Sequence, residues 1–213
     1  MSDCINLNMT LGAQYDVNIK KEEIYVGPYI ELFTGTLSFL DDTNIPEGVV
    51  SLRDYLFYFS YGLSTVSSEN IVSVGESTFY GSPLEYVHLP NLSSSGILSF
   101  AYTKIEEISF PELIIVSSQM FMGCENLVTA DFSKVERIDR YAFYNCTNLE
   151  NLILRTENGI PELYGDNIFY GTKIESGEGH IYVPRDAIRE YKAYSGWSTY
   201  ASQILPIEDE ISE

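Results

Sequence analysis

Positive charge is what this sequence has least of. It contains 12 Lys and Arg residues against 31 Asp and Glu, which gives a net charge of −19, and no Lys or Arg occurs between Arg53 and Lys104. A phosphate backbone or an anionic membrane surface would be repelled by such a protein, so we expect it to bind neither. The acidic residues are expected to keep the protein soluble, and a specific basic partner is the alternative.

Targeting signals and long apolar runs are also missing. The N-terminal residues Met1-Ser2-Asp3-Cys4-Ile5 carry no basic segment followed by an apolar one, as a secretory signal would require. No stretch approaches the ~20 apolar residues of a membrane-spanning helix. We therefore expect a chain that is made in a cytosol, is complete from Met1, and has no visible export route.

Catalytic and metal-binding motifs are absent as well. The two histidines, His88 and His180, have no Cys or His neighbour at zinc-ligand spacing. There is no phosphate-binding Gly-Lys-Ser/Thr loop, no dinucleotide fingerprint and no Gly-x-Ser-x-Gly elbow. We expect a protein that is not an enzyme and that needs no cofactor or metal.

What the chain does contain is one pattern repeated six times. Each copy has a phenylalanine, a small residue three positions later, and an aliphatic residue two or three positions after that. The phenylalanines are spaced by 22, 21, 21, 22 and 26 residues. A period near 22 with a recurring apolar pattern predicts a solenoid, in which stacked coils share one core. The predicted core positions are Phe57, Phe79, Phe100, Phe121, Phe143 and Phe169, with Leu63, Leu84, Ile105, Leu127, Leu149 and Ile174.

The small position holds Ser, Thr or Cys, and this bears on the cysteines. Cys124 and Cys146 occupy it in neighbouring repeats, so stacking brings them close enough for a disulfide to be conceivable. Packing as small apolar side chains is the favoured interpretation, because Ser or Thr fills the same position elsewhere. The same equivalence argues against a thiol nucleophile.

Local signals suggest short strands joined by tight turns. Alternations such as Leu84 with Tyr86, or Leu152 with Leu154, suit strands of three to four residues. Gly81, Gly123, Gly171 and Asn145 each follow a repeat phenylalanine by two residues, where we expect a positive φ.

The segment Val135-Glu136-Arg137-Ile138-Asp139-Arg140-Tyr141-Ala142-Phe143-Tyr144-Asn145-Cys146-Thr147-Asn148-Leu149 resembles the BspA-type (Treponema pallidum-like) leucine-rich repeat. The stretch from Ile181 to Ile207 resembles the terminal cap that follows such repeats. The resemblance covers residues 45 to 207. It implies an α/β solenoid, rich in β-structure, made of short leucine-rich-repeat coils.

Three regions are expected. Residues 1–44 form a small N-terminal β cap or docking element of two or three strands, from alternations such as Ile5 to Leu11 and Ile24 with Val26. Residues 45–184 form the repeats. Residues 185–213 form a C-terminal helical cap and acidic tail, with one or two helices over 185–202 and a cap core that includes Tyr191, Trp197 and Tyr200. Pro184 suits a helix start, and Ala187, Tyr191 and Tyr194 are expected on one buried face.

Tyrosine is abundant, with 17 residues, and many lie beside core positions. Such a tyrosine either shields the edge of a coil or belongs to an exposed recognition surface. The two interpretations stay open for Tyr55, Tyr58, Tyr61, Tyr80, Tyr86, Tyr102, Tyr144 and Tyr170.

Function is therefore expected to be protein binding without catalysis. The resemblance extends to proteins carried by phages and to bacterial surface adhesins. Because no export signal or wall anchor is visible, the resemblance favours a virion component in a tail, baseplate or head decoration that contacts virion subunits or the host surface. The alternatives are an adhesin-like protein of the bacterial cell surface, and a cytoplasmic acidic inhibitor or binding module for a basic protein. The binding residues and the oligomeric state do not follow from the sequence.

Overall fold

The computed structural model describes residues 4–11, 13–20, 45, 48–155 and 157–207. Strands β1 (Cys4–Leu11) and β2 (Ala13–Lys20) form an antiparallel hairpin whose register runs from Cys4 opposite Lys20 to Leu11 opposite Ala13. The third alternation expected in this region, at Ile24 and Val26, lies outside the described residues.

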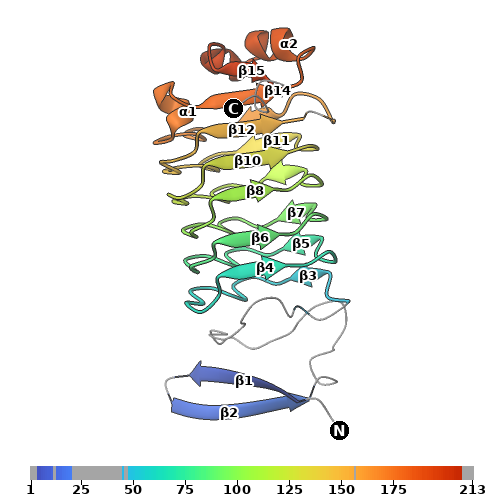
Figure 1. Cartoon of the computed structure of the whole chain (residues 1–213), viewed down its shortest axis with the longest axis vertical. Coiled ribbons are helices and arrows are strands. Elements are labelled where there is room, and N and C mark those ends of the chain that lie inside the picture. Colours follow the sequence, from blue (N-terminus) through green and yellow to red (C-terminus); the bar gives the residue numbers. More distant parts are fainter. Residues whose placement is uncertain (1–3, 12, 21–44, 46–47, 156, 208–213) are drawn as a thin grey trace.

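The repeats form a β-solenoid of about seven turns with little helix, as predicted (Figure 1). All strand pairs in the described part of the solenoid are parallel and join equivalent strands of neighbouring coils. The strand pairing is interrupted once on each face, between β6 and β8 and between β7 and β9. We name coils 1 to 6 by their phenylalanines, from Phe57 to Phe169. The long face is made of β4 (Thr65–Ser67), β6 (Tyr86–His88), β8 (Glu107–Ser109), β10 (Thr129–Phe132), β12 (Asn151–Leu154), β14 (His180–Val183) and β15 (Ile204–Pro206). The short face is made of β3 (Ser51–Leu52), β5 (Ser73–Val74), β7 (Ser94–Ser95), β9 (Ile115–Val116), β11 (Arg137–Asp139) and β13 (Glu162–Tyr164).

The third side of the solenoid, which we call the turn edge, carries the phenylalanines. It consists of residues 54–59, 76–81, 97–102, 118–123, 140–145 and 166–171. Backbone N–H groups two residues before, at, and two residues after the phenylalanine donate to carbonyls of the next coil. In coil 4, for example, Phe121 donates to Ala142 at 2.9 Å and Gly123 to Tyr144 at 2.8 Å. The turn edge is therefore a third coil-to-coil ladder, built without strands.

Two left-handed residues bracket each phenylalanine. The position two residues after it has φ between 51° and 76°, which confirms the expectation for Gly81, Gly123, Gly171 and Asn145. The position two residues before it is also left-handed, with φ between 50° and 59°, although no glycine occupies it in any coil; its residues are Tyr55, Ser77, Leu98, Gln119, Tyr141 and Asn167. This conformation costs about 1–2 kcal/mol for a residue with a Cβ. The N–H···O bonds that these same residues donate to the next coil offset part of that cost.

The phenylalanines form one continuous stack inside the solenoid. Each is at most 2% exposed, and successive rings lie 5.1–5.8 Å apart and nearly parallel. The six aliphatic positions of the repeat are buried beside them. The alternation of Leu84 with Tyr86 does not place both side chains inside: Leu84 is buried, whereas Tyr86 begins β6 facing outward and Val87 takes the inward position.

The small position of the repeat is buried in every coil, and in coils 2 to 6 its side chain also donates to a backbone carbonyl. The buried hydroxyl of Ser60, in coil 1, has no hydrogen-bond partner in the described part of the chain. The hydroxyls of Ser82, Thr103 and Thr172 donate to the carbonyl of the phenylalanine three residues earlier, at 2.7–2.9 Å. The thiols of Cys124 and Cys146 instead donate to the phenylalanine carbonyl of the preceding coil, at 3.1 and 2.9 Å. Both cysteines are free, so no disulfide joins them.

The C-terminal cap combines helix and strand. After the one-turn helix α1 (Lys173–Ser176) in coil 6, the chain forms α2 (Ile188–Ala193), the 3-10 helix η2 (Trp197–Tyr200) and then β15, which extends the long face. Tyr191 and Trp197 are fully buried, Tyr200 is half-buried, and the Trp197 indole N–H donates to the Pro161 carbonyl at 2.7 Å. The expectation for Tyr194 is wrong: it is 41% exposed, because α2 has already ended at Ala193 and Tyr194 is extended. Helix α2 also begins four residues after Pro184, so this proline does not start it.

Candidate functional site

Side chains that could bind a metal ion are scattered over the described part of the chain. Among the described residues, no three His, Cys, Asp or Glu side chains lie close enough to hold a metal ion. The ring of His88 contacts Glu69 at 3.2 Å on the exposed surface, and His180 packs against the ring of Tyr182.

The buried cysteines have the properties of packing residues. Burial raises the pKa of Cys124 to about 11, although its hydrogen bond with Thr103 acts in the opposite direction. Burial also raises the pKa of Cys146 well above its usual value. Both thiols are therefore protonated at neutral pH, where a nucleophile would need to be a thiolate.

Aromatic side chains gather outside the core on the turn edge of coils 1 to 3 and just beyond its end in coil 1. We define the aromatic patch as Tyr55, Tyr58, Phe59, Tyr61, Tyr80 and Tyr102. Ring contacts link all six, with centroids 4.7–6.0 Å apart. Tyr61 is 75% exposed, and Tyr80 is the one half-buried member of the patch. The sequence pointed to the tyrosines of this patch but left both interpretations open, and it did not single out Phe59.

The patch owes part of its order to a two-coil alternation. Two residues after each phenylalanine, the chain carries Phe59, Gly81, Tyr102, Gly123, Asn145 and Gly171 in turn. A Cβ on Gly81 would lie 2.5 Å from the Phe59 ring, and one on Gly123 would lie 2.5 Å from the Tyr102 ring. The rings of Phe59 and Tyr102 therefore each pack against a glycine of the next coil, and this contact fixes their positions.

Hydrogen bonding also fixes the rim of the patch. The Tyr55 hydroxyl donates to the Glu76 carboxylate of the next coil, and this bond is the main cause of the raised pKa of Tyr55. The Asp54 carboxylate accepts from the Glu76 backbone N–H at 2.7 Å. The rim of the patch is therefore acidic at this point.

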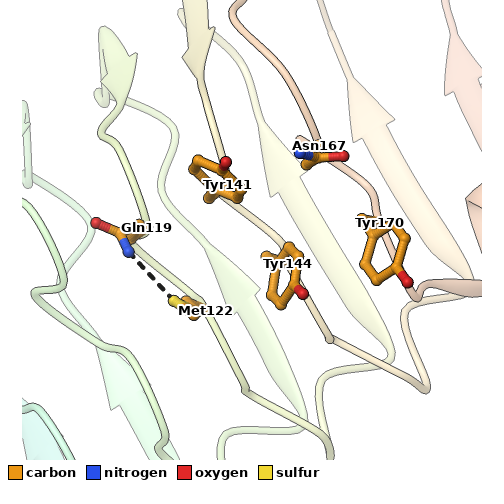
Figure 2. Close-up of a pocket in the computed structure, with 6 residues that line it drawn as sticks. All are labelled: Gln119, Met122, Tyr141, Tyr144, Asn167 and Tyr170. Carbon is orange, nitrogen blue, oxygen red and sulfur yellow. Dashed lines mark hydrogen bonds between the residues drawn. The ribbon is translucent and has the colours of Figure 1, made fainter.

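A depression of about 430 Å³ lies on the same edge in coils 4 to 6 (Figure 2). We define the turn-edge depression by its lining residues, Gln119, Met122, Tyr141, Tyr144, Asn167 and Tyr170. These are the residues two before and one after the buried phenylalanine in three successive coils. Among these residues, the sequence pointed only to Tyr144 and Tyr170. The other four share a signal in the sequence, because they too lie two residues before or one residue after a repeat phenylalanine.

The long face carries a third feature, an acidic groove of about 450 Å³ over β6, β8 and β10. Glu85, Glu106, Glu107 and Asp131 line it together with Tyr86 and His88. Asp131 is paired with Arg155 at 2.6 Å, and no lysine or arginine lines the groove.

Comparison with known proteins gives the chain a family. Residues 29–150 and 73–185 match the family described as BspA type leucine rich repeat region, in 6 copies. The matched region begins at residue 29, before the first described coil. No curated protein matches the chain. Within the described residues, no helix is long and apolar enough to cross a bilayer. The matched repeats coincide with the coils of the solenoid and with its phenylalanine stack. The chain therefore belongs to the BspA-type leucine-rich repeat family, whose members are in general protein-interaction scaffolds.

Proposed function

We propose that this protein is a non-enzymatic scaffold that docks a protein partner through the aromatic patch of coils 1 to 3. The observation that carries the proposal is the gathering of six aromatic side chains on one edge, in contact with one another and largely exposed. Rings that serve only the core would be buried, and an edge that serves only to contact water would carry polar side chains at these positions. Contiguous exposed aromatic surface is typical of interaction sites.

The chemistry of the patch suits protein recognition. Tyrosine offers a large apolar ring and a hydroxyl, and it loses little side-chain entropy on binding. The rings hold one another, and Phe59 and Tyr102 lie against glycines of the next coil, so the surface is ordered before a partner arrives. Such preorganisation lowers the entropic cost of association.

A photo-crosslinking residue at position 61 tests the docking surface. We expect it to form a protein adduct in the cells or particles that contain this chain, and we expect Tyr58→Ser to reduce the yield. The matched control is the same residue at position 164, because Tyr164 is a comparably exposed tyrosine, at 59%, on the short face. Equal adduct yield from positions 61 and 164 would contradict the assignment.

We further propose that the scaffold acts in a phage virion, in a tail, baseplate or head decoration, and contacts the host surface or a neighbouring subunit. The stacked coils support this role because parallel strand pairs on two faces and backbone hydrogen bonds along the turn edge hold them together as a rod. The acidic composition, with a net charge of −19, supports a location away from packaged nucleic acid. A surface adhesin of a bacterium is the alternative setting for the same patch.

Mass spectrometry of purified virions, washed host cells and cytosol separates these settings. Enrichment in virions is the expected result. Enrichment on washed cells would favour the adhesin, and recovery in the cytosol alone would refute both.

The acidic groove on the long face supports a second candidate function, the binding of a basic protein. Glu85, Glu106 and Glu107 present negative charge there, while Arg155 pairs with the fourth acidic residue, Asp131. Attraction of this kind weakens steeply with salt because the charges are solvent-exposed. Pull-down at low and high salt tests this function, and we expect the Glu106→Gln variant to retain less of a basic partner than the unaltered protein does. If both proteins retain the partner equally, the groove is not its binding site.

A further inference from the structure

The turn-edge depression of coils 4 to 6 differs chemically from the surface around it. We propose that it is a binding site for a neutral oligosaccharide. Its residues are separate from the aromatic patch of coils 1 to 3, so the inference does not depend on the protein partner proposed above.

The depression is a regular array of three pairs of side chains. Figure 2 shows Tyr141 and Tyr144 between the Gln119–Met122 pair and the Asn167–Tyr170 pair. The residue two before the phenylalanine is left-handed in each of these coils, with φ of 57–59° at Gln119, Tyr141 and Asn167. Each coil therefore contributes one pair of side chains from a backbone conformation that repeats along the axis.

The lining side chains are uncharged, and all of them except Met122 combine apolar surface with a polar group. The lining consists of three phenols, two carboxamides and a thioether, in a protein whose net charge is −19. A charged ligand would find no opposite charge among the lining side chains. A sugar hydroxyl, in contrast, both donates and accepts hydrogen bonds, as amides and phenols do. The apolar C–H groups of a pyranose ring can pack against the exposed edges of the tyrosine rings, because the faces of Tyr144 and Tyr170 that point toward each other are stacked together.

The polar groups of the lining are available to a ligand. Within the described part of the chain, the Gln119 amide donates only to the Met122 sulfur, at 3.3 Å, and sulfur is a weak acceptor. In the same described residues, the side-chain amide of Asn167 and the hydroxyls of Tyr141, Tyr144 and Tyr170 have no hydrogen-bond partner. Water satisfies these groups in the free protein, and a sugar hydroxyl can take its place at little cost in hydrogen bonding.

The spacing of the array suits an extended chain of sugars. The Tyr144 and Tyr170 rings are stacked 5.0 Å apart, which is the advance from one coil to the next. This advance is comparable with the length of one pyranose unit in an extended oligosaccharide. Three successive coils would then address successive units of a ligand that runs along the solenoid axis.

Isothermal titration with cellohexaose and chitohexaose, two neutral extended oligosaccharides, tests the proposal, and an oligogalacturonate hexamer serves as the acidic comparison. We expect at least one neutral probe to bind, with Kd on the order of 0.1–1 mM. Tyr170→Ser and, separately, Gln119→Ala should each weaken that binding about tenfold, through loss of a ring contact or an amide hydrogen bond. Circular dichroism establishes that each variant is folded.

The control is Tyr194→Ser, which removes an exposed tyrosine at the end of α2, outside every binding surface described above, and should leave the affinity unchanged. The proposal is overturned if neither neutral probe binds, if the acidic hexamer binds as tightly, or if Tyr194→Ser weakens binding as much as Tyr170→Ser. A protein adduct formed from position 144 instead of sugar binding would also overturn it. Crosslinking at position 61 is unaffected by these outcomes, so the two proposals fail separately.

Discussion

Replacing Phe121 with alanine tests the core of the solenoid. The ring is fully buried and lies between Phe100, at 5.8 Å, and Phe143, at 5.5 Å, in the aromatic stack. Removing a buried phenylalanine costs roughly 3–5 kcal/mol, and the cost rises when the cavity cannot collapse. Here the coils on both sides are fixed by backbone bonds, from Phe100 to Met120 at 3.0 Å and from Phe121 to Ala142 at 2.9 Å. We therefore expect a loss of about 4–5 kcal/mol in the free energy of unfolding.

Guanidinium titration followed by far-UV circular dichroism and by the fluorescence of Trp197 measures this loss. Trp197 is buried in the cap, so it reports the C-terminal end of the stack while dichroism reports all coils. Because a solenoid is held by neighbour contacts, the two transitions of Phe121→Ala should separate. The control Tyr86→Ala, at an exposed position, should cost less than about 0.5 kcal/mol. A loss for Phe121→Ala below about 2 kcal/mol, or one equal to the control, would refute the assignment of inward positions.

Three further predictions concern the turn edge, a buried thiol and the cap. Gly123→Ala should destabilise the fold by about 2 kcal/mol or more, because its Cβ would meet the Tyr102 ring at 2.5 Å and its φ is +70°. In a Tyr102→Ala background, Gly123→Ala should cost only about 1 kcal/mol, which is the conformational cost of an alanine at positive φ. A double-mutant cycle measures this difference, and additive losses from the two substitutions would show that the Cβ and the Tyr102 ring do not overlap. Cys124, with its pKa near 11, should react with a thiol reagent only in denaturant, and fast reaction of the native protein at pH 8 would show that it is not buried. Trp197→Phe should cost about 1–3 kcal/mol in chemical denaturation, since it leaves the buried Pro161 carbonyl without the indole donor; an unchanged midpoint would mean that this bond contributes nothing.

The repeat itself made the fold predictable from the sequence. Each coil must bury the same phenylalanine, small residue and aliphatic residue against the next coil, so the period and the apolar pattern define the stack. Glycines two residues after the phenylalanine marked a left-handed position, and φ values of 66–76° are found at Gly81, Gly123 and Gly171. The cap was read less well, because Tyr194 lies just beyond the end of α2, where helical periodicity no longer applies.

Which side chains are exposed on the surface could not be predicted from the sequence in the same way. Tyr86 and Tyr191 have the same side chain, yet one is 55% exposed and the other fully buried, because neighbouring coils and the cap decide which faces are covered. The left-handed position before each phenylalanine carries no sequence signal, since Tyr, Ser, Leu, Gln and Asn all occupy it.

The sequence by itself therefore determined the solenoid, its core columns and its acidic character, because these follow from local periodicity and composition. Only the tertiary structure decided which side chains meet across coils. The aromatic patch and the turn-edge depression join residues about 22 positions apart, and their geometry is set by the coil-to-coil hydrogen bonds of the turn edge. Those bonds form between backbone groups, which every residue carries, so the side-chain sequence does not reveal them.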